Sequence, residues 1–110
     1  MQDWQKQFET MRSQFLSRAQ ERLATIEQLL RTLEMAPDAD MLRDLRQHFH
    51  WLAGSGGTYK FPKVTDLGVN GEEICDEFLE NGKIIDLEGI GRLNSILRGV
   101  REQFLSVTNA

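Results

Sequence analysis

Residues 48–62 read HFHWLAGSGGTYKFP, and this stretch decides how the chain folds. It contains both histidines of the chain and three of its nine glycines. Apolar residues before it recur at helical spacing, whereas glycine weakens a helix interior by about 1 kcal/mol relative to alanine. Pro62 suits the first turn of a helix, where its missing N–H is not needed. The stretch therefore predicts the end of one helix, a short connection and the start of another.

Hydrophobic periodicity on both sides of this connection predicts four helices and no strand. Apolar residues recur three or four positions apart, which is the spacing of one helix face. Pro37 and the Asn81-Gly82 turn interrupt the pattern. Asp38 or Asp40 is the expected N-cap of the second helix, and Asp86 that of the fourth. The short connections favour an all-α fold, an antiparallel four-helix bundle with a long N-terminal helix. The expected helices cover residues 3–35, 39 to 56 or 57, 62–80 and 86–107.

The first predicted helix is long for a small domain. At 1.5 Å per residue it would reach roughly 45–50 Å, so we expect a break or an overhanging end near residues 4–8. Trp4 and Phe8 would then either pack on the last helix or mediate self-association. The inward stripe of the first helix is predicted to be Phe8, Met11, Phe15, Ala19, Leu23, Ile26, Leu30 and Leu33. That of the last helix is predicted to be Leu87, Ile90, Leu93, Leu97, Val100 and Phe104, with Val107 as a marginal member.

Length and composition limit the classes of protein to which the chain can belong. With 110 residues we expect a single domain over residues 1–110. A net charge of −4 argues against nucleic acid as a partner, because phosphate backbones attract basic surfaces. The single cysteine, Cys75, cannot form an internal disulfide, and no apolar run approaches the roughly 20 residues that span a bilayer. The composition predicts a cytoplasmic protein without direct membrane contact.

The two histidines are predicted to lie on different sides of the second helix. Its apolar stripe places His50 outward and His48 at the border of the core, about 160° apart. Two metal ligands on one helix normally stand three or four residues apart, so this pair does not indicate a metal site. The glycines also lack the lysine and the preceding strand of a phosphate-binding loop. Gly54 lies one turn beyond His50, where it either ends the helix beside an ordinary exposed histidine or leaves room for a partner.

The residues from His50 to Ser55, HWLAGS, resemble the motif of the histidine-containing phosphotransfer (HPt) domain. These bundle domains serve two-component phosphorelays. Their pattern is H-x-L-(K or A)-G-S, followed by small residues, an aromatic-containing turn and another amphipathic helix. The resemblance is good over residues 42–78, and the flanking helices match by pattern only.

The resemblance implies that His50 accepts a phosphoryl group from a phospho-aspartate and passes it on. Imidazole suits this role because its neutral, nucleophilic form is plentiful at pH 7. Gly54 would give clearance beside the histidine. The implied partners are response-regulator receiver domains, with a histidine kinase as a further partner. The chain would be a phosphoryl carrier and not an enzyme, without its own cofactor, and Mg²⁺ would belong to the receiver.

The sequence departs from the family pattern at Ala53, where many members carry a lysine that attracts phosphate. The residues that could replace this charge or contribute to docking are Arg43, Arg46, Gln47, Trp51, Ser55, Lys60 and Lys63. Trp51 is expected to face outward beside His50, as an exposed aromatic docking residue. Gly71 replaces a bulkier residue and would either form a dent against the histidine helix or allow closer packing. The missing lysine leaves an alternative function, a non-phosphorylated helical module that docks a receiver or another signalling protein.

Overall fold

The computed structural model describes residues 2–108 and contains four α-helices joined by short connections. No strand occurs among these residues, so the predicted all-α bundle is confirmed. The outer limits of the predicted single domain, residue 1 and residues 109–110, lie outside the described residues. The helices are α1 (Gln2–Met35), α2 (Ala39–Ser55), α3 (Pro62–Glu80) and α4 (Leu87–Thr108), with a 3₁₀ turn η1 (Gly57–Tyr59) between α2 and α3.

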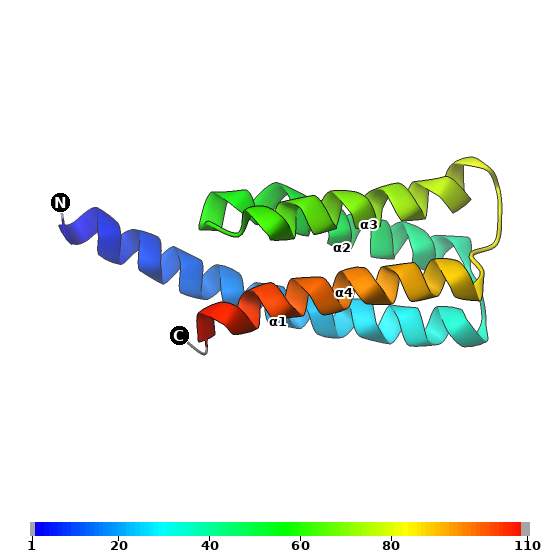
Figure 1. Cartoon of the computed structure of the whole chain (residues 1–110), viewed down its shortest axis with the longest axis horizontal. Helices are drawn as coiled ribbons and strands as arrows, with labels where there is room; N and C mark the ends of the chain where they lie inside the picture. Colours follow the sequence, from blue (N-terminus) through cyan, green and yellow to red (C-terminus); the bar gives the residue numbers. More distant parts are fainter. Residues whose placement is uncertain (1, 109–110) are drawn as a thin grey trace.

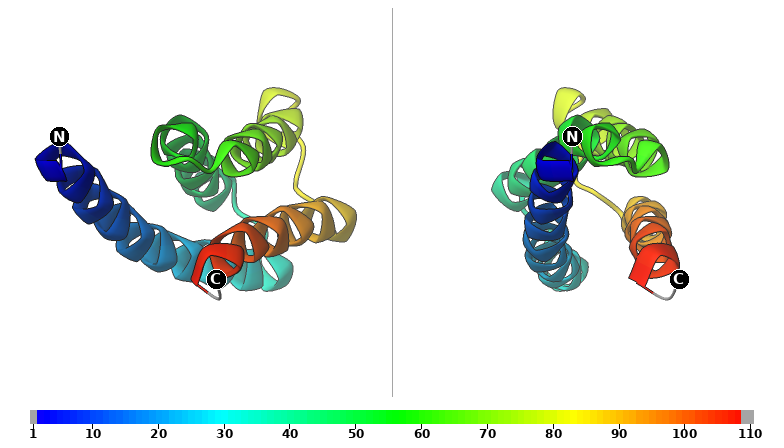
Figure 2. Two further views of the ribbon diagram at one scale, coloured as in Figure 1. Left: turned by 60° about the vertical axis from the view of Figure 1, so that its left-hand side comes forward. Right: turned by 90° about the vertical axis from the view of Figure 1, so that its left-hand side faces the viewer.

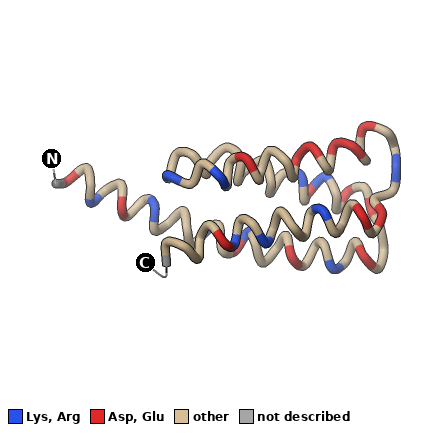
Figure 3. The backbone as a smooth tube through the Cα atoms, in the orientation of Figure 1, with Lys and Arg blue, Asp and Glu red and all other residues tan. Residues whose placement is uncertain are grey.

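The helices run alternately up and down, and each one packs against two neighbours (Figure 1). The α2–α3 connection, residues 56–61, forms one end of the bundle, which we call the tip. The α1–α2 and α3–α4 connections, residues 36–38 and 81–86, form the opposite end, which we call the base. Helices α2 and α3 make the most extensive contact of any pair. Acidic residues follow α3 toward the base, whereas basic residues stand at the tip (Figure 3).

The helix ends follow the capping rules that the sequence suggested. The Asp38 carboxylate accepts hydrogen bonds from the backbone N–H groups of Asp40 and Met41 at the start of α2. Asp86 accepts one from the N–H of Gly89 at 2.8 Å at the start of α4. Both interactions satisfy backbone donors that a first helical turn leaves unpaired.

Helix α1 extends past the tip, as Figures 1 and 2 show. The predicted overhang is thus confirmed, and the helix continues through it without a break. Phe8 stacks on Tyr59 with ring centroids 6.3 Å apart, and so it packs on the tip rather than on α4. Met11 was expected in the core but is 49% exposed, because no other helix covers this part of α1. Leu87 was also expected in the core but is exposed, and Ile85 from the preceding connection is buried in its place.

An aromatic cluster joins α1, α2 and α4 to the α2–α3 connection at the tip end of the core. Phe15 of α1 is fully buried and stacks on Tyr59 and Trp51, with centroids 4.6 and 5.3 Å away. Phe61 and Phe104 meet edge to face at 5.1 Å and both lie against Phe15. Aromatic pairs in these geometries contribute stability beyond the area that they bury. The cluster therefore fixes the C-terminal half of α2, which carries both histidines.

Two glycines of α3 set its close approach to α2. A Cβ added to Gly68 would lie 2.6 Å from the backbone nitrogen of Ala53, and one on Gly71 would lie 2.5 Å from the Phe49 ring. Real side chains do not tolerate such distances, so both positions depend on the missing Cβ. Gly71 thus accommodates the Phe49 ring, and the dent and the closer packing that the sequence left as alternatives occur together. The two helices are consequently held at fixed depth and register around residue 50.

Candidate functional site

His50 lies on the edge of α2 that faces α3, with its side chain 66% exposed. Its Nδ1 is 3.0 Å from Oε1 of Glu72, a carboxylate that is only 16% exposed. An ionised carboxylate can only accept hydrogen bonds, so Nδ1 carries the proton and donates a hydrogen bond to Glu72. In the neutral ring the lone pair is then on Nε2. Glu72 thereby presents Nε2 as the nucleophilic nitrogen of an accessible histidine.

Arg46 connects this pair to a second carboxylate. Its Nε donates to Oδ1 of Asp76 at 2.6 Å, and one of its terminal nitrogens lies 3.7 Å from Oε2 of Glu72. The hydrogen bond to Asp76 is the largest cause of a raised Arg46 pKa, and burial opposes it. His50 and Arg46 stand one turn apart on α2, and Glu72 and Asp76 one turn apart on α3. We call these four residues the histidine network.

Gly54 lies one turn beyond His50 and is exposed. An added Cβ at this position would meet no heavy atom within 4 Å. Gly54 is thus not needed for packing within the bundle, in contrast to Gly68 and Gly71. Open space therefore lies beside His50, at the position where the family resemblance implies clearance.

His48 and Trp51 occupy the opposite edge of α2 and pack against α1. Nη1 of Arg22 lies 3.2 Å from Nδ1 of His48, and the Arg22 guanidinium stands 4.4 Å from the Trp51 ring centroid. Burial, and then the Arg22 charge, lower the pKa of His48, against a smaller opposing effect of Asp44. The expectation that Trp51 faces outward beside His50 is therefore wrong. Helical periodicity placed Trp51 toward solvent, but its ring stacks on Phe15 and is partly buried against the core.

The remaining candidate residues are spread over α2 and the tip. Arg43 forms an ion pair with Asp40 in the preceding turn, and Gln47 is exposed on α2. Ser55 is half-buried in the last turn of α2. Lys60 adopts a left-handed backbone conformation with φ of 68°, and its Nζ lies 5.2 Å from the Phe8 ring centroid. Lys63 is exposed in the first turn of α3.

Sequence reasoning missed the two carboxylates of the histidine network. Glu72 and Asp76 are one turn apart on α3, matching the one-turn spacing of Arg46 and His50 on α2. This pair of complementary spacings is the signal that could have identified them. Choosing them among the many acidic residues of the chain required the register of α3 against α2, which depends on Gly68 and Gly71.

A comparison with models of protein families shows to which family the chain belongs. The sequence model of the Hpt domain family matches residues 10–103, which is most of the chain. The chain belongs to the Hpt domain family. No curated protein and no solved structure matches the sequence significantly. Hpt domains are helical bundles that carry phosphoryl groups on histidine in phosphorelays, where they interact with receiver domains and kinases.

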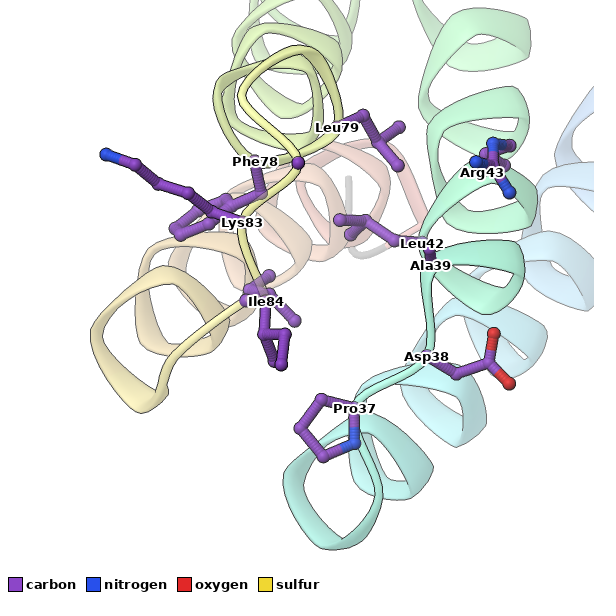
Figure 4. A pocket seen from close by; sticks show the side chains of 11 residues that line it. Pro37, Asp38, Ala39, Leu42, Arg43, Phe78, Leu79, Lys83 and Ile84 are labelled. Atoms are coloured by element: carbon purple, nitrogen blue, oxygen red, sulfur yellow. The ribbon is translucent and has the colours of Figure 1, made fainter.

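A partly enclosed cavity of this Hpt domain is away from the histidine network. A cavity of about 160 Å³ opens at the base, between residues 37–43 and 78–85 (Figure 4). Leu42 and Leu79 point into it, whereas the charged ends of Asp38 and Lys83 point away. His50 stands three turns into α2, about 16 Å from its first residue. His50 thus lies away from this cavity, with its side chain exposed.

Within residues 2–108, no cluster of three or more His, Cys, Asp or Glu side chains is arranged to hold a metal ion. None of the helices in this range combines the length and apolar character that crossing a bilayer requires.

Proposed function

We propose that His50 is the phosphoacceptor of this Hpt domain, receiving a phosphoryl group from a receiver-domain phospho-aspartate and passing it to another. The observation that supports this choice is the Glu72 hydrogen bond, which leaves Nε2 of an exposed histidine as the free nucleophile. His48 offers no such arrangement, because its Nδ1 faces Arg22 and its ring is half-buried.

In the transfer step, the Nε2 lone pair attacks phosphorus and the bond to the aspartyl oxygen breaks. The carboxylate leaves with the electron pair, and the imidazole ring becomes a cation that still carries its proton on Nδ1. Glu72 faces that proton and balances the new ring charge. In the return step, a receiver carboxylate attacks phosphorus and the electron pair of the P–N bond goes back to Nε2. Such reactions depend mainly on in-line positioning and charge stabilisation.

The receiver domain would dock over the exposed edge of α2. We propose that it also holds the Mg²⁺ ion between its own acidic residues. Gly54 leaves space for its active site to close over His50, and Gln47 borders the same surface. Val69 of α3, which is 41% exposed and lies one turn before Glu72, offers an apolar contact. A histidine kinase is a second proposed partner of this surface.

Phosphate mapping on matched variants tests the proposal. The protein is incubated with phosphoramidate, or with a phosphorylated receiver domain, and analysed for acid-labile, base-stable phosphate. We expect uptake by the wild type and by His48→Gln, and none by His50→Gln. Phosphate that persists in His50→Gln would contradict the assignment.

The alternative, a docking module that is not phosphorylated, is supported by Ala53 in place of the motif lysine. Arg43 and Arg46, the nearest basic residues before His50 on α2, both form ion pairs with carboxylates. This alternative predicts receiver binding that His50→Gln leaves unchanged, together with no phosphate uptake by the wild type.

A further inference from the structure

We propose that Arg46, anchored by Asp76, is a positioning residue for His50 and acts on it through Glu72. The inference builds on the proposed function, since it concerns the same histidine. Its observable consequence in the unphosphorylated protein does not depend on phosphotransfer. Arg46 touches neither the phosphoryl donor nor the reacting nitrogen in this proposal.

The distances within the histidine network show how the positions depend on one another. Arg46 is held by Asp76 with a 2.6 Å hydrogen bond and stands farther from Glu72, at 3.7 Å. Asp76 therefore fixes the guanidinium, and Glu72 keeps Oε1 for the His50 ring at 3.0 Å. The two oxygens of Glu72 are divided, one toward His50 and the other toward Arg46.

Glu72 needs a nearby cation for two physical reasons. Its carboxylate is mostly covered, and a covered charge is costly unless it is paired. Asp76 lies one turn away on the same helix, and like charges at this spacing repel each other. Arg46 stands between the two carboxylates and offsets both effects. Without it, Glu72 would be drawn toward solvent and away from Nδ1.

The consequence for His50 is a choice between tautomers. With Glu72 in place, the proton is on Nδ1 and the lone pair on Nε2. Without Glu72 in place, the exposed ring samples both tautomers, and part of the population presents a protonated, unreactive Nε2. Arg46 thus determines how much of His50 is ready to react, although it lies one turn away.

The experiment compares Arg46→Gln, Arg46→Lys and Asp76→Asn with the wild type. Arg43→Gln is the matched control, because Arg43 is also an exposed-edge arginine of α2 but pairs with Asp40. Two-bond ¹H–¹⁵N spectra of the neutral imidazoles report the tautomer of each histidine. The rate of phosphorylation by phosphoramidate reports the reactivity of His50.

We expect Arg46→Gln to move His50 from the Nδ1–H form toward a mixture and to slow phosphorylation about threefold to tenfold, the coupling typical of one charged network contact. Asp76→Asn should have a smaller effect in the same direction. Arg46→Lys should restore part of the rate, because it returns the charge but not both hydrogen bonds that the guanidinium donates to Asp76, from Nε at 2.6 Å and from Nη2 at 3.4 Å. The His48 signals and the Arg43→Gln protein should match the wild type.

If Arg46→Gln shows the same His50 tautomer and the same phosphorylation rate as the wild type, the positioning role of Arg46 is wrong. If Arg46→Gln fails to fold, Arg46→Lys and Asp76→Asn decide, and unchanged spectra and rates in both would overturn it equally. A wild type that takes up no phosphate on His50 would instead contradict the proposed function. The tautomer comparison would still test the link from Arg46 to His50 in that case.

Discussion

The two edges of α2 carry one histidine each, and the neighbouring helices give the two imidazole rings opposite hydrogen-bond partners. On the edge that faces α1, Arg22 can only donate, so Nδ1 of His48 accepts and its proton is on Nε2. On the edge that faces α3, Glu72 accepts, so His50 has its proton on Nδ1. Two histidines two positions apart are thus held in opposite tautomers. The neighbouring helix, and not the residue type, determines which nitrogen can react.

The two edges of α2 also differ in how far they are covered by other residues. His48 lies beside Trp51, whose ring is covered by Phe15 and Arg22. His50 lies beside Gly54, which has open space around it. The α1-facing edge stabilises the bundle, whereas the α3-facing edge leaves a prepared side chain accessible. Truncating a side chain on the first edge should therefore cost stability, whereas changing the contacts of His50 on the second edge should change its reactivity.

The largest expected effect is on the α1-facing edge. Trp51→Ala should lower the free energy of unfolding by about 2–3 kcal/mol, because it removes the stack on Phe15 and the contact with Arg22. Urea denaturation measures the loss. The folded variant should still be phosphorylated on His50 by phosphoramidate. Trp4→Ala is the control and should cost little, since Trp4 is 61% exposed on the overhang. Equal losses in both variants would contradict the division between the edges.

A smaller effect of opposite sign is expected on the α3-facing edge. Gly54→Ala should raise the free energy of unfolding by about 0.5–1 kcal/mol, because alanine favours the helix and the added Cβ meets no atom. Gly91→Ala on α4 is the matched control, as Gly91 also has open space. Thermal denaturation should show similar gains for both. A loss of stability in Gly54→Ala alone would show that the site is not open.

The same two positions test the clearance that we propose for Gly54. Transfer from a phosphorylated receiver domain should slow in Gly54→Leu and stay unchanged in Gly91→Leu. Phosphorylation by phosphoramidate, a small donor, should be similar in both. Equal receiver rates in the two variants would argue against docking over Gly54.

The smallest expected effect is a pH dependence from His48. Its pKa is lowered in the folded protein, mainly by burial and then by Arg22. Below about pH 6.5 the unfolded chain therefore binds more protons at this residue than the folded chain, so stability falls as pH falls. His48→Gln should reduce this slope between pH 7 and 5, as followed by urea denaturation at several pH values. An identical slope in the variant would contradict the assigned cause.

The fold could be predicted from the sequence because its signals are local. Apolar spacing, Pro37, Pro62 and the aspartate caps act within one or two turns, and they placed the helix ends within a residue or two. His50 and Gly54 could be placed on the outer face of α2 for the same reason.

The errors and omissions depended on contacts between helices. Trp51 is covered by Phe15, which lies on a different helix and far from it in the sequence. Glu72 and Asp76 become partners of α2 only at the register that Gly68 and Gly71 allow. Met11 repeats the core spacing, but the other helices end before reaching it. Periodicity describes one helix and contains no information about where its neighbours stop.

The close pairing of α2 and α3 also bears on the order in which the chain assembles. His50 and Glu72 are 22 residues apart, whereas the ion pair between Glu27 and Arg101 joins α1 to α4 across 74 residues. Closing a short loop loses less chain entropy than closing a long one, and local contacts tend to form early. We therefore expect the hairpin of α2 and α3 to form first and to bring His50 to Glu72 before the ends of the chain meet.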